Sequence, residues 1–266
     1  MIPVLYTIGS FNVYSFGIFL AIAFILSTFI VWKLSREEFK EEEHLDAYFY
    51  TALVTLIVGR TVYILRNWQD FKFIILKYFL VVETPGLSML GGAVGGIIFL
   101  YFYCKRKKIN FYHMGDLFAV ASSLGLVFIK IGQQLGGAAF GKQTDFFLKV
   151  KILGRAGFYH PAELYESLIY TFLFVILLVF YKRGLRKKWH SGIIFSLFVL
   201  VVSLSTIILE FIKVYRVYLY GLSFRQLLGI LIFIVTTVFL SNRIGFIKKL
   251  LNFFKKTNHE VSKRNS

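Results

Sequence analysis

Long apolar runs alternate with short polar segments along almost the whole chain. Seven of these runs approach the roughly 20 apolar residues that an α-helix needs to cross the hydrocarbon core of a bilayer. We therefore predict an all-α fold, a polytopic membrane protein with about seven transmembrane helices. The predicted spans are Phe11–Val31, Leu45–Leu65, Leu87–Tyr103, Met114–Leu135, Leu164–Tyr181, Ile193–Ile212 and Gln226–Leu240.

Two segments between the predicted spans differ in composition or length from the short polar segments elsewhere. Phe71–Val82 is apolar but too short to span, and it contains Lys72 and Lys77, so we predict a short interfacial helix whose lysines snorkel to the membrane surface. Gly136–Pro161 is the longest loop and is rich in glycine and aromatic residues. Residues 1–242 are predicted to form one membrane domain, and residues 243–266 a basic tail with a disordered end.

Composition supports a membrane location. Hydrophobic residues make up 57% of the chain and the mean hydropathy is +0.68, more apolar than the roughly 45–50% typical of soluble domains. The single cysteine, Cys104, allows no internal disulfide and is expected to pack as a small apolar residue. The first ten residues lack the basic region of a cleavable signal peptide, so the first span is expected to be retained.

The distribution of basic residues predicts the orientation of the chain. The net charge is +17, but lysine and arginine occur in short clusters between apolar runs, which is typical of membrane topology rather than of nucleic-acid binding. The clusters at 33–45, 105–108, 182–188 and 243–266 all fall on one face. That face is predicted to be cytoplasmic, which places the C-terminus inside and, with an odd number of spans, the N-terminus outside the plasma (inner) membrane.

Several charged, amide or imidazole side chains lie inside the predicted spans or directly before one, where burial is expensive and usually marks a functional site. The alternation of the spans places all of them in the outer half of the membrane. Together they predict a polar, mixed-charge pocket open to the outer leaflet, although any one of them alone is equally explained as a headgroup anchor or a structural ion pair. They are Arg60, Lys130, Gln133, Gln134, His160, Glu163, Glu166, Glu210 and Gln226.

Glycines form a stripe along the third span, at positions 86, 91, 92, 95 and 96. Small residues allow two helices to approach closely, and the same positions allow a lipid to approach the backbone, so both interpretations stay open. The five histidines show no spacing typical of a metal site, and we predict none.

Several sequence motifs of the chain resemble those of a known family, the prolipoprotein diacylglyceryl transferases of bacteria. The resemblance covers nearly the whole chain in order and spacing, and its most specific element is the intact His-Pro-x-x-Leu-Tyr-Glu of residues 160–166. The other matching elements are Tyr14 within residues 13–17, Gly59-Arg60, Gly86-x-Ser88 followed by Gly91-Gly92, Glu210-Phe211 and Gln226.

The resemblance implies a reaction and its partners. The diacylglyceryl group of phosphatidylglycerol would be transferred to the lipobox cysteine thiol in a prolipoprotein signal peptide, and glycerol phosphate would leave. The implied partners are phosphatidylglycerol, such signal peptides and membrane lipids, with no cofactor and no nucleic acid.

The resemblance also implies roles for individual residues. Lys130, His160 and Glu166 are the expected catalytic residues. Lys130 and Arg60 would supply cations for the leaving phosphate, and His160 would be the base that generates the thiolate, oriented by Glu163 or Glu166. The expected substrate-binding residues are Tyr14, Arg60, Ser88, Gly91, Gly92, Gln133, Gly141 and Glu210.

The chain departs from the family pattern in its fourth span, where the family has Gly-Arg-x-Gly-Asn-Phe-x-Asn-x-Glu. Lys130 replaces the arginine, keeping a point charge but losing the bidentate fork. Two alternatives to an active transferase remain open. One is a family member that has lost catalysis and binds lipid or lipoprotein. The other is a small membrane transporter, which is less favoured because the polar groups cluster at one leaflet. The further departures are Gln133 for the asparagine, Ala138 for the glutamate, Leu90 for a histidine and Thr206 for an arginine.

Overall fold

The computed structural model describes residues 4–8, 11–36, 41–72, 86–137, 140–152, 154–187, 189–214 and 218–245. Within these ranges the chain forms seven long helices and the short helix α3 (Trp68–Phe71). Two small antiparallel sheets pair β1 (Val4–Ile8) with β2 (Phe11–Tyr14), and β3 (Val150–Lys151) with β4 (Phe158–Tyr159). The long helices are α1 (Ser15–Ser35), α2 (Glu41–Arg66), α5 (Met89–Lys107), α6 (Phe111–Gly136), α7 (Ala162–Lys187), α8 (Ile193–Leu209) and α9 (Phe224–Ile244).

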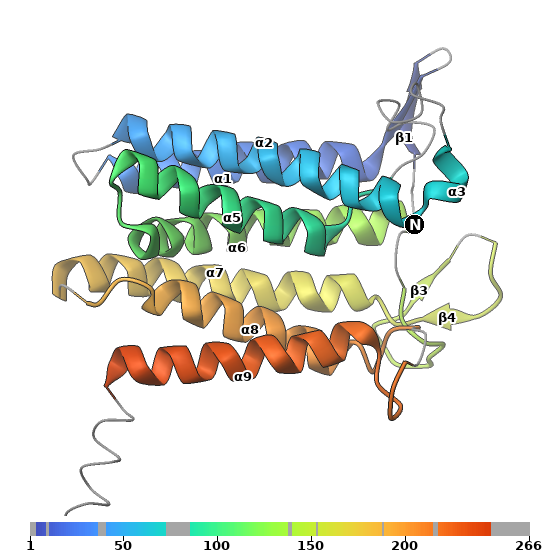
Figure 1. Cartoon of the computed structure of the whole chain (residues 1–266). Helices are drawn as coiled ribbons and strands as arrows, with labels where there is room; N and C mark the ends of the chain where they lie inside the picture. The colour runs from blue at the N-terminus through green and yellow to red at the C-terminus, as the bar shows by residue number, and fades with distance from the viewer. Residues whose placement is uncertain are drawn as a thin grey trace, which may run out of the picture.

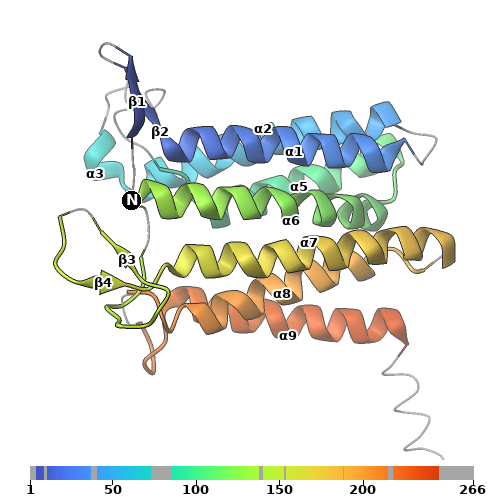
Figure 2. The same ribbon diagram turned by 180° about the vertical axis from the view of Figure 1, so that it is seen from behind.

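The long helices lie side by side and alternate in direction (Figures 1 and 2). Both sheets and α3 lie at one end, which we call the sheet end; there α1, α5, α7 and α9 begin and α2, α6 and α8 finish. Helix α6 is central, because it packs against α1, α7 and α8, while α2 packs on α5 and α9 on α8. Its apolar residues, among them Leu117 and Val120, are buried on several sides, as expected of an interior helix.

Five of these helices are long and apolar enough to cross a membrane: α1, α2 over Glu42–Arg66, α6, α7 over Ala162–Leu185, and α9. Helix α8 is also apolar but shorter, with 17 residues, and α5 carries three basic residues in its last turn. The helical, multi-pass character of the prediction is therefore confirmed, while the number of seven spans stays a prediction.

The predicted start of the first span is wrong. Residues 11–14 form the strand β2, whose Asn12 and Tyr14 pair with Thr7 and Val4 of β1. The helix α1 begins only at Ser15. Aromatic and β-branched residues favour strands as well as membrane spans, so the apolar run alone did not separate the two. Of the predicted interfacial helix, residues 73–82 lie outside the described residues, as does the predicted tail from residue 246 onward.

The glycine stripe lies at the contact between α5 and α2. A Cβ atom on Gly92 would lie 2.8 Å from the Thr55 carbonyl oxygen, and one on Gly91 would lie 2.6 Å from Cβ of Val62. Both distances are too short for any larger residue, so the two helices pack closely through these positions. The packing interpretation of the stripe is therefore the one that the structure supports.

Candidate functional site

Four charged side chains meet inside the bundle near the sheet end. We call this group, made of Lys130 on α6, Glu163 and Glu166 on α7, and Lys213 just after α8, the tetrad. The Lys130 ammonium lies 2.7 Å from Glu163 Oε2 and 2.5 Å from Glu166 Oε2. The Lys213 ammonium lies 2.6 Å from Glu163 Oε1 and 2.5 Å from Glu166 Oε1. Each lysine thus bridges both carboxylates, and the exposed fraction of each residue is between 2% and 6%.

Local structure explains why these groups meet. Glu163 and Glu166 are three residues apart near the start of α7, so they lie on one face, and a carboxylate is favourable near a helix N-terminus. Lys213 is held at the end of α8, where its backbone N–H lies 3.2 Å from the carbonyl oxygens of both Leu209 and Glu210. Both carboxylates therefore lie on the face of α7 that Lys130 reaches from α6 and Lys213 reaches from the end of α8.

The tetrad carries no net charge, since two ammonium groups face two carboxylates. Charges are tolerated away from water only when they are paired and hydrogen-bonded. Removing one member leaves an uncompensated buried charge, a change that typically costs about 3–5 kcal/mol. The arrangement therefore holds two ammonium groups at fixed positions inside the bundle.

His160 lies half-buried just before α7 and contacts Tyr165. Its Nδ1 is 3.2 Å from the Tyr165 hydroxyl, which donates to the carbonyl oxygen of Leu148 at 3.1 Å. Because that hydroxyl uses its proton on Leu148, it accepts from Nδ1–H, and the neutral ring then carries its lone pair on Nε2. The side chain that contacts the His160 ring at Nδ1 is therefore Tyr165, where Glu163 or Glu166 was expected.

Gly141 joins the His160 segment to the tetrad. Its N–H donates to the carbonyl oxygen of His160 at 2.9 Å, and it forms an isolated antiparallel bridge with Lys213. A Cβ atom at this position would lie 2.5 Å from Cβ of His160 and 2.8 Å from its carbonyl oxygen. Glycine is therefore required for the close backbone approach between these segments.

Glu210 lies at the C-terminus of α8 beside the start of α9. The Ser223 hydroxyl donates to Glu210 Oε1 at 3.2 Å, and the Ser223 N–H donates to Gln226 Oε1 at 2.9 Å. The Gln226 amide in turn donates to the carbonyl oxygen of Ile207 at 3.2 Å. Glu210 and Gln226 thus belong to a buried network that joins the end of α8 to the start of α9. Glu210 precedes Lys213 of the tetrad by three residues.

Arg60 belongs to a second group, between α2 and α5. Its guanidinium donates to the carbonyl oxygen of Gly86 at 3.0 Å and lies 5.2 Å from the ring centroid of Phe71. Ser88 caps α5 by accepting from the Gly91 N–H at 3.2 Å, and its own N–H donates to Gly59 at 2.9 Å. Arg60, Ser88, Gly91 and Gly92 therefore lie together at the sheet end, on other helices than the tetrad.

The remaining predicted residues lie at the edges of these groups. Tyr14 is the last residue of β2, directly before α1, and Gln133 is half-buried on α6, three residues after Lys130. Of the departures, Leu90 is 43% exposed, and the Thr206 hydroxyl donates to the carbonyl oxygen of Val202 at 2.9 Å. Ala138 lies outside the described residues.

Lys213 is the site residue that the sequence did not identify. Lys213 lies just beyond the predicted sixth span, so it is not among the charged residues that the sequence places inside the spans. The signal that could have found it is its position three residues after Glu210, with Phe211, Ile212 and Val214 around it. A lone lysine in an apolar segment is expected to have a buried partner.

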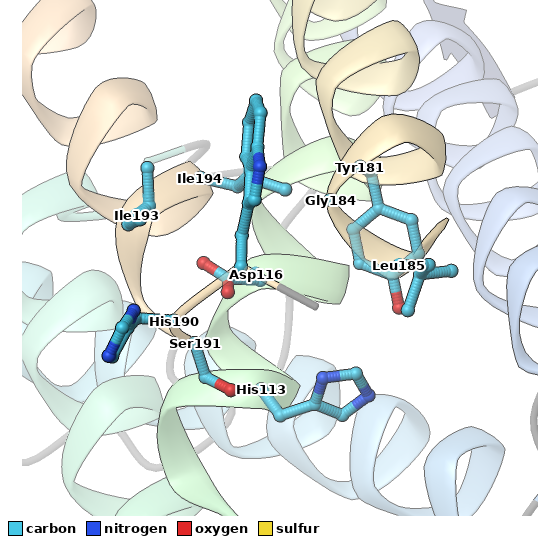
Figure 3. A pocket seen from close by; sticks show the side chains of 10 residues that line it. His113, Asp116, Tyr181, Gly184, Leu185, His190, Ser191, Ile193 and Ile194 are labelled. Carbon is cyan, nitrogen blue, oxygen red and sulfur yellow. The ribbon is translucent and has the colours of Figure 1, made fainter. Parts of the chain in front are cut away.

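A small pocket of about 120 Å³ lies at the opposite end of the bundle (Figure 3). Asp116 lies in it and accepts from the N–H groups of Gly192 at 2.6 Å and Phe195 at 2.7 Å, so this carboxylate caps the start of α8. His113 and His190 also line the pocket, but in the described part of the chain no three metal-binding side chains lie close enough to hold an ion.

The fold and the tetrad define a class: a multi-pass helical membrane protein with a buried, ion-paired site near one end of its bundle. The family model described as prolipoprotein diacylglyceryl transferase matches residues 3–241. The chain belongs to this family, and the resemblance inferred from its motifs is confirmed.

Three relatives named phosphatidylglycerol–prolipoprotein diacylglyceryl transferase illustrate the similarity. The protein of Clostridioides difficile is 29% identical over 244 residues, which cover 90% of this chain and 96% of the relative. That of Clostridium tetani is 29% identical over 223 residues, covering 80% and 86%. That of Bacteroides fragilis is 26% identical over 229 residues, covering 79% and 81%.

Proposed function

We propose that this chain transfers the diacylglyceryl group of phosphatidylglycerol to the lipobox cysteine thiol of prolipoproteins, at the outer leaflet of the plasma membrane. Membership in the family and the names of its relatives support the reaction class. The observation that carries the proposal for this chain is the tetrad, because it keeps two cations in a buried site despite the departures from the family pattern.

Each residue of the site has a separate role in the proposed reaction. The cysteine sulfur attacks the glyceryl carbon that bears the phosphate, forming a C–S bond, and the C–O bond to the phosphate breaks. His160 takes the thiol proton on Nε2, and glycerol phosphate leaves with the electron pair of the broken bond. Lys130 and Lys213 stabilise the charge on that phosphate, while Glu163 and Glu166 hold both ammonium groups in place before the substrate arrives.

We propose the following topology. Seven helices cross the membrane, the N-terminus and the tetrad lie toward the outside, and residues 243–266 form a cytoplasmic tail. The basic residues in the last turns of α1, α5 and α9 support this orientation, since they gather at the end opposite the sheets. Lysine and arginine clusters on one face are the main determinant of membrane orientation.

The proposal is tested with purified protein in vesicles of phosphatidylglycerol and a reporter peptide that contains a lipobox cysteine. We expect lipidation of the reporter by the wild type, none of a Cys→Ser reporter, and a loss of about 10²–10³ in kcat for Lys130→Ala, the usual effect of removing one group that stabilises developing charge. Lys149→Ala is the control, because Lys149 pairs only loosely, at 3.8 Å, with the exposed Asp145.

A well-inserted wild-type protein that lipidates no reporter would contradict the proposal. Binding of phosphatidylglycerol without transfer would instead favour the alternative, a family member that binds lipid without catalysis. Equal rates for Lys130→Ala and wild type would remove Lys130 from the mechanism and leave the reaction itself in place.

A further inference from the structure

Gln134 is a buried amide without a partner. Its exposed fraction is 4%, and within the part of the chain that the structure describes neither Nε2 nor Oε1 of its side chain has a hydrogen-bond partner. Leaving both ends of a buried amide unpaired is destabilising, and folded proteins rarely do so without a functional reason. This side chain therefore points to a ligand that supplies the missing hydrogen bonds.

Gln134 lies on the face of α6 that carries Lys130 of the tetrad. It follows Lys130 by four residues on α6, so the two lie on one face of the helix, one turn apart. Side chains on a helix tilt toward its N-terminus, which directs the Gln134 amide back toward Lys130. Gly132 and Gly136 lie on the other face, because a Cβ on either would meet Phe19 or Phe16 of α1.

Packing does not account for a glutamine at this position. The family pattern Gly-Arg-x-Gly-Asn-Phe has phenylalanine where this chain has Gln134, so an apolar side chain is compatible with the fold there. An apolar residue would also avoid the cost of burying an unpaired amide. The glutamine thus adds hydrogen-bonding capacity one helical turn from Lys130 of the proposed phosphate site.

We propose that Gln134 is a substrate-positioning residue whose amide binds the glycerol hydroxyls of the phosphatidylglycerol headgroup while the adjoining phosphate contacts Lys130. A hydroxyl both donates and accepts, and so does an amide, whereas an ammonium only donates and suits phosphate oxygens. Gln134 therefore distinguishes a glycerol-bearing phosphate from a bare one. This inference rests on the proposed function and assigns a specificity residue within the same site.

The test compares wild type with Gln134→Met, which keeps the length of the side chain and removes both polar ends. We expect KM for phosphatidylglycerol to rise at least about tenfold with kcat little changed, because both hydrogen bonds of the amide to the substrate are lost in ground and transition state alike. Inhibition by glycerol phosphate weakens by a similar factor, while inhibition by inorganic phosphate is unchanged. The melting temperature without lipid rises, since an unpaired buried amide is gone.

Gln226→Met is the matched control for stability. Gln226 is also fully buried, but its amide is bonded to Ser223 and Ile207, so the same substitution lowers the melting temperature. If Gln134→Met also lowers it, the Gln134 amide is bonded within the fold and the inference is wrong. Unchanged KM and unchanged inhibition by glycerol phosphate overturn it as well, whatever the melting temperature.

The two hypotheses fail in different ways. A wild type that transfers nothing contradicts the proposed function and leaves the ligand question to a binding measurement. Adding glycerol phosphate then raises the melting temperature of a protein that binds it. A smaller rise for Gln134→Met than for wild type supports the inference, and equal rises overturn it.

Discussion

Lys213→Met tests whether the tetrad is a balanced set of charges that the enzyme needs for transfer. The substitution removes one ammonium from contacts of 2.6 Å and 2.5 Å and leaves two buried carboxylates on Lys130 alone. One uncompensated buried charge costs about 3–5 kcal/mol. For a protein of this size we expect the melting temperature in detergent to fall by on the order of 10 °C, and the transfer of diacylglyceryl to the reporter to be lost.

A second substitution separates charge balance from chemistry. Lys213→Met combined with Glu163→Gln leaves Lys130 paired with Glu166 at 2.5 Å and restores neutrality, so most of the lost stability should return. Transfer should not return, because one cation for the leaving phosphate is still missing. The reasoning is refuted if Lys213→Met melts like the wild type, or if the double variant is fully active. Lys149→Ala, a surface control, should leave both readouts unchanged.

Two further predictions concern the segment around His160. Gly141→Ala places a Cβ atom 2.5 Å from Cβ of His160 and 2.8 Å from its carbonyl oxygen, so kcat should fall at least tenfold. Gly136→Ala, whose Cβ would have an ordinary 3.6 Å contact, should transfer normally, and similar rates for both variants would contradict the steric argument. Tyr165→Phe removes the hydroxyl that accepts from Nδ1 of His160, so kcat should fall by roughly tenfold with KM for phosphatidylglycerol unchanged, and a change confined to KM would refute the orienting role.

Hydropathy predicted the helical, multi-pass architecture, because the length of an apolar run depends only on local composition. It failed at Phe11–Tyr14, where aromatic and β-branched residues suit both a strand and a span. It also left the glycine stripe ambiguous between helix packing and lipid access. Only the positions of Thr55 and Val62 across the contact decided for packing, and no pattern within the third span contains that information.

The polar residues predicted for the site separate into two groups in the structure. Lys130 and Glu166 meet directly, but Arg60 lies on α2 with Gly86 and Ser88. The place of these residues near one end of the bundle was predictable from sequence, because it follows from the position of a residue within its apolar run. Which helices face each other was not predictable, since that depends on packing between segments far apart in the chain.

The tetrad bears on the departure at Thr206, where the family pattern has an arginine. The family pattern has a cation four residues before Glu210, where this chain has Thr206, and by sequence alone a cation of the site is lost. Lys213 follows the same glutamate by three residues and puts an ammonium between Glu163 and Glu166. The site therefore keeps two cations, and Thr206 by itself does not imply a chain that has lost catalysis.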